Sequence, residues 1–142
     1  MSYYVSKKDF ELYKKRSEDY KNNGYPNCDK KMIPIIDYIN TLDGVCAVWC
    51  CEGHIEKDND RWHIVTVVTK DGYTNLFNWY SGLLKNNFKF LFLLRFEIHS
   101  SYLIDPIHND LHPIHELHAL CVNKKEKKGF FKIINAYIDT LK

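Results

Sequence analysis

The chain has 142 residues, of which 45% are hydrophobic and 27% are charged, and its formal net charge is +2. This length suits one domain, so we expect residues 1–142 to form a single domain around one core. The small net charge gives no argument of its own for nucleic-acid binding. No apolar run reaches the roughly 18 residues of a membrane span, which excludes a membrane-spanning protein. With an odd number of cysteines and no signal-peptide pattern, we expect a cytoplasmic protein with free thiols.

The N-terminal part of the chain predicts two helices. Ser6–Asn22 has apolar residues at helical spacing, and Ser6 is a suitable N-terminal cap. Lys30–Thr41 repeats the pattern with Asp29 as its cap. Asp43 and the glycine after it end this second helix.

Two strands then follow as a predicted hairpin. Val45–Cys51 is short and nearly all apolar, which is typical of a strand covered on both faces. Arg61–Thr69 is rich in β-branched residues, and the polar residues 56–60 suit the turn between them.

The second half of the chain predicts two further helices and two further strands. In chain order, we expect a helix over Tyr73–Asn86 capped by Thr74, a central strand over Phe88–His99, a loop over Ser100–Pro113, a strand over His115–Val122, a charged turn over Asn123–Lys128 and a helix over Gly129–Lys142. The order ααββαββα predicts an α/β (α+β) fold, in which a small mixed sheet of about four strands packs with helices.

Cysteines and histidines raise the question of a metal or a reactive thiol. Zinc prefers four such ligands in tetrahedral geometry. Cys51 and His54 have a suitable spacing, but no second clean pair completes the set, so we assign no residue to a metal. An activated Cys51 thiolate would need a neighbouring base, and the sequence shows no third residue to orient one.

A ligand pocket beyond the end of the strand Val45–Cys51 is the hypothesis that we favour. A glycine just after a strand lets the main chain approach a ligand, and strand ends commonly border clefts. Arg95, Glu97 and His99 alternate along Phe88–His99, so their face is either exposed to solvent or lines a pocket in which neighbours or a ligand pair the charges. The expected ligand-binding residues are Cys51, Glu52, Gly53, His54, Trp62, His63, Arg95 and His99, and the expected catalytic bases are Glu97 and His54.

The segment from Lys14 to Ile55 resembles a known family. It has a lysine-rich helix, then MIPIIDYIN, then a strand that ends in CCEGHI. This pattern is similar to the tRNA wybutosine-synthesising methyltransferases of the TYW-three type, with Asn40, Cys51, Gly53 and Ile55 at matching positions. The family has serine at positions 50 and 52 and arginine at position 54. The resemblance implies S-adenosylmethionine as cofactor and an RNA base as methyl acceptor.

Three hypotheses about function follow. The first is a pocket for a nucleotide-like or adenosyl ligand, with methyl transfer to RNA if the protein is an enzyme. The second is a phage- or virus-type binding protein that sequesters a nucleotide signal or blocks a host partner without turnover. The third is a zinc-dependent hydrolase or zinc module, which rests on the cysteine and histidine count alone. The oligomeric state stays open.

Overall fold

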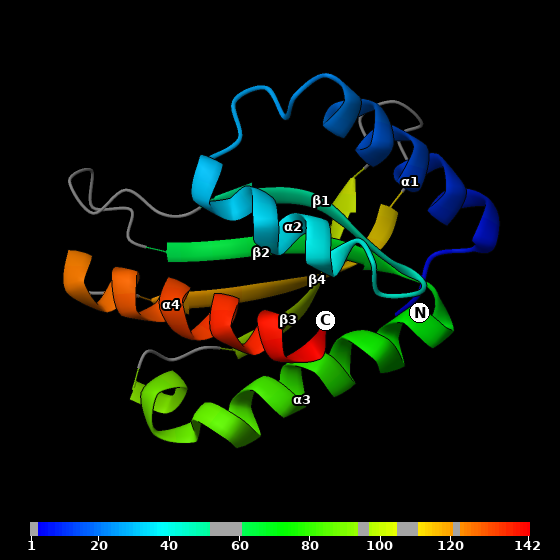
Figure 1. Ribbon diagram of the computed structural model, residues 1–142. Helices are drawn as coiled ribbons and strands as arrows, with labels where there is room; N and C mark the ends of the chain where they lie inside the picture. The colour runs from blue at the N-terminus through cyan, green and yellow to red at the C-terminus, as the bar shows by residue number, and fades with distance from the viewer. Residues whose placement is uncertain (1–2, 52–60, 94–96, 105–110, 121–122) are drawn as a thin grey trace.

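The computed structural model describes residues 3–51, 61–93, 97–104, 111–120 and 123–142 (Figure 1). The elements are helix α1 (Lys7–Asn22), a 3-10 turn (Lys30–Met32), helix α2 (Ile33–Ile39), strands β1 (Val45–Cys51) and β2 (Arg61–Val68), helix α3 (Lys70–Leu93), strands β3 (Glu97–Ile104) and β4 (Leu111–Leu120), and helix α4 (Lys124–Leu141). The chain therefore has the predicted α/β fold, with helices and strands in the predicted order.

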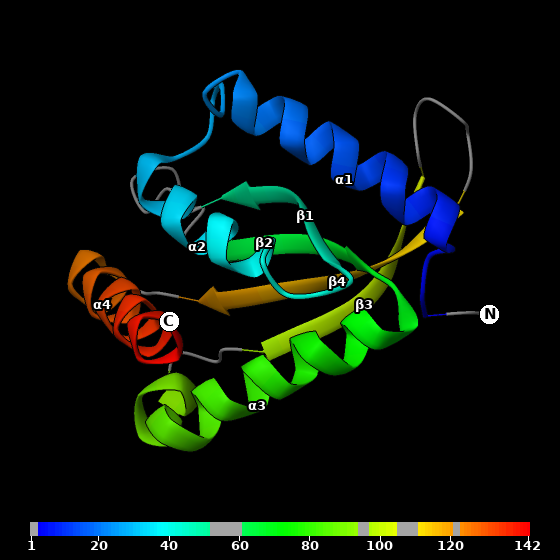
Figure 2. The same ribbon diagram turned by 45° about the vertical axis from the view of Figure 1, so that its right-hand side comes forward.

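The strands form one sheet in the order β1-β2-β4-β3. All three pairings are antiparallel, so the sheet is antiparallel rather than mixed. One face packs against α2, α3 and α4 around Trp62, Ile64 and Leu117, and the other packs against α1 around Phe10 and Val67. Figure 2 shows α1 on one side of the sheet and α3 and α4 on the other.

Local sequence signals account for the helix ends. Ser6 caps α1 as expected, because its hydroxyl accepts a hydrogen bond from the Asp9 amide at 3.1 Å. Asp29 occupies the N-terminal cap position of the 3-10 turn as expected, but its side chain makes no capping hydrogen bond. Helix α4 begins five residues earlier than Gly129, because Asn123 caps it through a 2.9 Å bond to the Glu126 amide.

The predicted central strand Phe88–His99 is the main error in the sequence-based assignment. Helix α3 begins at Lys70, so Thr74 is not its cap, and the helix continues through residues 88–93 past non-helical dihedral angles at Asn87. Strand β3 begins only at Glu97, extends to Ile104 through part of the predicted loop, and lies at the edge of the sheet. An unbroken apolar run suits a buried helix as well as a strand, and here the helix prevails.

Candidate functional site

The sheet register brings several of the predicted site residues together. His63 on β2 lies opposite Cys51 on β1 and His118 on β4, and His118 lies opposite Glu97 on β3. His99 lies opposite Glu116, one position along the same face. Residues directly opposite in antiparallel strands have Cβ atoms about 5 Å apart, so this row of positions is contiguous. We call His63, His99, Glu116 and His118 the histidine face.

The side chains of His99, Glu116 and His118 lie close together. The rings of His99 and His118 have centroids 4.3 Å apart. The Nδ1 atom of His118 lies 3.7 Å from a carboxylate oxygen of Glu116. His118 is nearly buried whereas His99 is exposed, so the face runs from the interior of the sheet to its surface.

Trp62 does not belong with His63, contrary to the prediction. Successive residues of a strand point to opposite faces, and Trp62 is fully buried on the other one, where its ring meets Phe130 at 4.9 Å. It is part of the core. Among the other expected site residues, Glu52, Gly53, His54 and Arg95 lie outside the described residues, as do the side chains of Cys51 and Glu97.

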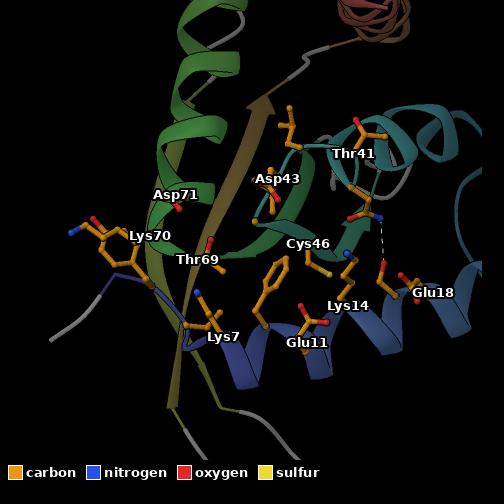
Figure 3. Close-up of a pocket in the computed structure, with 18 of the residues that line it drawn as sticks. Lys7, Glu11, Lys14, Glu18, Thr41, Asp43, Cys46, Thr69, Lys70 and Asp71 are labelled. Carbon is orange, nitrogen blue, oxygen red and sulfur yellow. Dashed lines mark hydrogen bonds between the residues drawn. The ribbon is translucent and has the colours of Figure 1, made fainter.

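A groove of about 1070 Å³ lies at the opposite end of β1. Helix α1 forms one wall, the turn between α2 and β1 forms the other, and the turn between β2 and α3 closes the corner (Figure 3). Phe10 and Cys46, which belong to the apolar cluster under α1, form its floor. We call this cavity the α1 groove.

The walls of the α1 groove carry charges of both signs. From α1 come Lys7, Glu11, Lys14, Glu18 and Lys21, which recur every three or four residues and so share one side of the helix. From the other side come Asp37, Asp43, Lys70 and Asp71. Figure 3 shows the labelled α1 residues on the side of the helix that faces Cys46 and Asp43.

One end of the groove is fixed by polar contacts between α1 and α2. The Asn40 amide donates to the Ser17 hydroxyl at 3.2 Å, and its oxygen accepts from the Ala47 amide at 2.8 Å. Asn40 thereby covers part of the free edge of β1, which would otherwise present an unpaired N–H. Lys21 and Asp37 form an ion pair at 3.5 Å beside it.

Cys46 is the thiol of the groove, and it is held in its protonated form. Burial raises the pKa of Cys46 to about 11, although the Ser17 hydroxyl and the Lys14 ammonium act in the opposite direction. A thiol with this pKa is almost entirely neutral at pH 7 and is a poor nucleophile. Its place in the groove therefore favours packing over covalent chemistry.

Two other histidines of β4 have structural contacts. The Nδ1 atom of His112 forms a 2.5 Å hydrogen bond with the Tyr13 hydroxyl of α1. His115 is fully buried and bonds to Tyr3 and Ser100. Among the described residues, no group of three histidine, cysteine, aspartate or glutamate side chains could hold a metal ion as they stand. The described side chains thus give the zinc hypothesis no support.

The predicted site and the α1 groove lie at different ends of β1. The sequence drew attention to cysteines and histidines, whereas the groove is lined by lysines, acids and turn residues that resemble ordinary surface. The one signal in the sequence was the regular spacing of the charges along α1.

Comparison with known proteins adds no relative. No protein-family model matches the chain, and neither a curated protein nor a solved structure matches it. In the described part of the chain, no helix combines the length and the apolar character needed to cross a membrane.

Proposed function

We propose that the protein binds a nucleotide-like or adenosyl compound in the α1 groove. The observation that supports this most is the combination of a floor with apolar side chains and walls that carry both lysines and carboxylates. Small-molecule sites are concave, with apolar lining and a few polar groups that fix orientation. A volume of about 1070 Å³ leaves room for a ligand of this size together with water.

The charge pattern favours a ligand that carries both charges. Lys7 and Lys14 of α1 can bind a carboxylate or phosphate, and Asp43 and Asp71 across the groove can bind an ammonium group. A compound with a single charge would leave one set of side chains without a matching partner. The amino-acid end of an adenosyl compound has both groups, and its adenine could pack on Phe10.

S-adenosylmethionine is therefore the first compound to test, in agreement with the cofactor that the resemblance implies. Methyl transfer to an RNA base would need mainly positioning of the two reactants. Exposed lysines at the start of α4, such as Lys124, Lys125 and Lys128, offer an RNA backbone a basic surface. The roles of Glu97 and His54 as bases stay predictions.

Binding without turnover is the second candidate. It is favoured by the lining itself, because the described residues of the groove include no histidine and the Cys46 thiol is protonated. That described lining thus offers neither an imidazole nor a thiolate as a general acid or base. A protein of this kind would sequester a nucleotide signal and release it unchanged.

The test is a thermal-shift and calorimetric screen with S-adenosylmethionine, S-adenosylhomocysteine, AMP and adenosine. At a ligand concentration of 100 Kd, the free energy of unfolding should rise by about 2.7 kcal/mol, which corresponds to a shift in Tm of several degrees. We expect the two zwitterionic compounds to shift Tm and uncharged adenosine to leave it unchanged. Chromatography of the recovered ligand, with and without RNA, then separates methyl transfer from plain binding.

Neighbouring lysines on α1 give a matched control. Lys14→Ala should weaken binding by about tenfold or more, the loss of one charge-assisted bond of roughly 1.5–3 kcal/mol. Lys15→Ala removes the same charge from an exposed position that does not line the groove, and should bind like the unaltered protein. Equal affinities of the two variants, or no binding of any compound, would refute a ligand site in this groove.

A further inference from the structure

The N-terminal segment forms one end of the α1 groove. Tyr4, Val5 and Ser6 all contribute to its lining. Two hydrogen bonds attach the segment to the sheet: the Val5 amide donates to the Val68 carbonyl, and the His115 Nε2 atom bonds to the Tyr3 carbonyl, each at 2.9 Å. The pairing of β2 with β4 ends at Thr66 and His115, so the segment attaches just beyond the point where those two strands separate.

The hydrogen bonds of His115 define its protonation. A carbonyl can only accept, so Nε2 must carry the proton that it donates to Tyr3. The other ring nitrogen, Nδ1, lies 2.9 Å from the Ser100 hydroxyl on β3 and accepts from it in the neutral ring. Burial lowers the pKa of His115 below its usual range, which agrees with a neutral imidazole in this single tautomer.

Aromatic packing connects His115 to the groove. The ring of Tyr73 at the start of α3 meets the Tyr4 ring at 5.5 Å and the His115 ring at 5.0 Å, both edge to face. Tyr4 lines the groove, so the sequence Tyr4–Tyr73–His115 joins the groove to β4. A buried histidine that bonds a segment distant in the chain fixes where that segment lies.

We propose that His115 is a positioning residue for the α1 groove. It holds the Tyr3–Ser6 segment in place and so closes the end of the groove at which that segment lies. Its effect on ligand affinity rests on the proposed function, but its effect on the segment and on access to the groove floor does not. The residue would touch no ligand and would act only through the segment.

Two substitutions of His115 separate its hydrogen bond from its bulk. Gln keeps an N–H donor in reach of the Tyr3 carbonyl, whereas Leu fills a similar space with no donor. Two measurements need no ligand: hydrogen exchange of the Val5 amide, and alkylation of Cys46, which lies in the groove floor and is only 2% exposed. Cys28, half-buried and outside the groove lining, is the internal reference for alkylation.

With His115→Leu we expect both Val5 exchange and Cys46 alkylation to accelerate by about tenfold, while exchange in α4 and alkylation of Cys28 stay unchanged. With His115→Gln both rates should return close to those of the unaltered protein. Equal rates in the Leu and Gln variants, or a uniform increase across the whole chain, would overturn the proposal, because a general loss of stability would then explain the result.

A milder variant keeps the test decisive if His115→Leu does not fold. Ser100 is exposed, and its hydroxyl bonds to the His115 ring. Ser100→Ala removes that hydroxyl and should raise the exchange rate of the Val5 amide severalfold. Unchanged exchange in that variant would contradict the proposal. Where the unaltered protein binds S-adenosylhomocysteine, His115→Leu should also lower its affinity; faster exchange with unchanged affinity would refute a role in the groove. If no compound binds, only the proposed function fails, and the ligand-free rates still decide the role of His115.

Discussion

The two faces of the sheet are covered to different extents. Three helices pack on one face and enclose a large apolar cluster that includes Trp62, Ile64 and Leu117. On the other face, α1 alone packs over a smaller cluster around Phe10 and Val67. Four strands span about 19 Å, and a helix with its side chains is about 10 Å wide, so one helix covers roughly half of such a sheet.

This difference shows where polar sites can form in a small α/β fold. The face with three helices is closed by apolar packing. On the face with one helix, the α1 groove lies between α1 and the edge strand β1. The histidine face lies on the same side of the sheet, on β2, β3 and the C-terminal half of β4. The thinner cover therefore leaves room for both candidate binding regions, one charged and one rich in imidazole.

The largest expected effect tests the difference in packing on one strand. Ile64 is fully buried toward the three helices, and its neighbour Val65 is only half-buried toward α1. We expect Ile64→Ala to lower the free energy of unfolding by about 2–5 kcal/mol, and Val65→Ala by about 1 kcal/mol. Chemical denaturation measures both. Similar losses for the two variants would mean that both faces are packed equally well.

The next effect concerns the two turns at the corner of the groove. A Cβ atom on Gly72 would lie 1.9 Å from the Gly44 carbonyl oxygen, so Gly72→Ala forces the start of α3 away from the turn between α2 and β1. We expect a loss of about 3 kcal/mol, at the upper end of overpacking. Gly24→Ala is the control: Gly24 has φ +80° but nothing near its Cβ position, so only the backbone cost of about 1 kcal/mol applies. Equal losses in thermal unfolding would show that the contact between the turns is not limiting.

The smallest effect concerns the polar closure of the groove. Asn40→Leu leaves the Ala47 amide without its acceptor, and we expect it to cost about 1–2 kcal/mol. Asn40→Asp keeps that acceptor but loses the bond donated to Ser17, so less should be lost. Urea unfolding compares the two; a larger loss for Asp than for Leu would place the main contribution in the Ser17 bond instead.

The fold was largely predictable because local signals and global packing agree over most of the chain. The bounds of β1 are confirmed at both ends, and Ser6 caps α1 as expected. The strand predicted at Phe88–His99 failed because apolar residues without clear periodicity leave helix and strand equally open. The correct assignment of this segment depends on the rest of the fold, because Glu97–Ile104 forms the edge strand of the sheet.

The site was predictable only where strand pairing decides it. Once β2 and β4 pair, His63 and His118 must lie side by side, and the alternation of strand residues sends Trp62 to the core. The α1 groove depends instead on α1 lying beside two turns that are distant in sequence. No property of Lys14, Asp43 or Asp71 taken alone reveals that they line one cavity.

The contact between Gly44 and Gly72 has a consequence for recognising relatives of this chain. The backbones of Gly44 and Gly72 touch, and the Thr69 hydroxyl also lies against Gly44, so neither glycine can gain a side chain unless these neighbours move. In a set of diverged sequences, we expect this glycine pair to persist while the charges along α1 drift. A search pattern anchored on the pair, with the two strands Val45–Cys51 and Arg61–Val68 between them, would reach more distant homologues than one anchored on the cysteines.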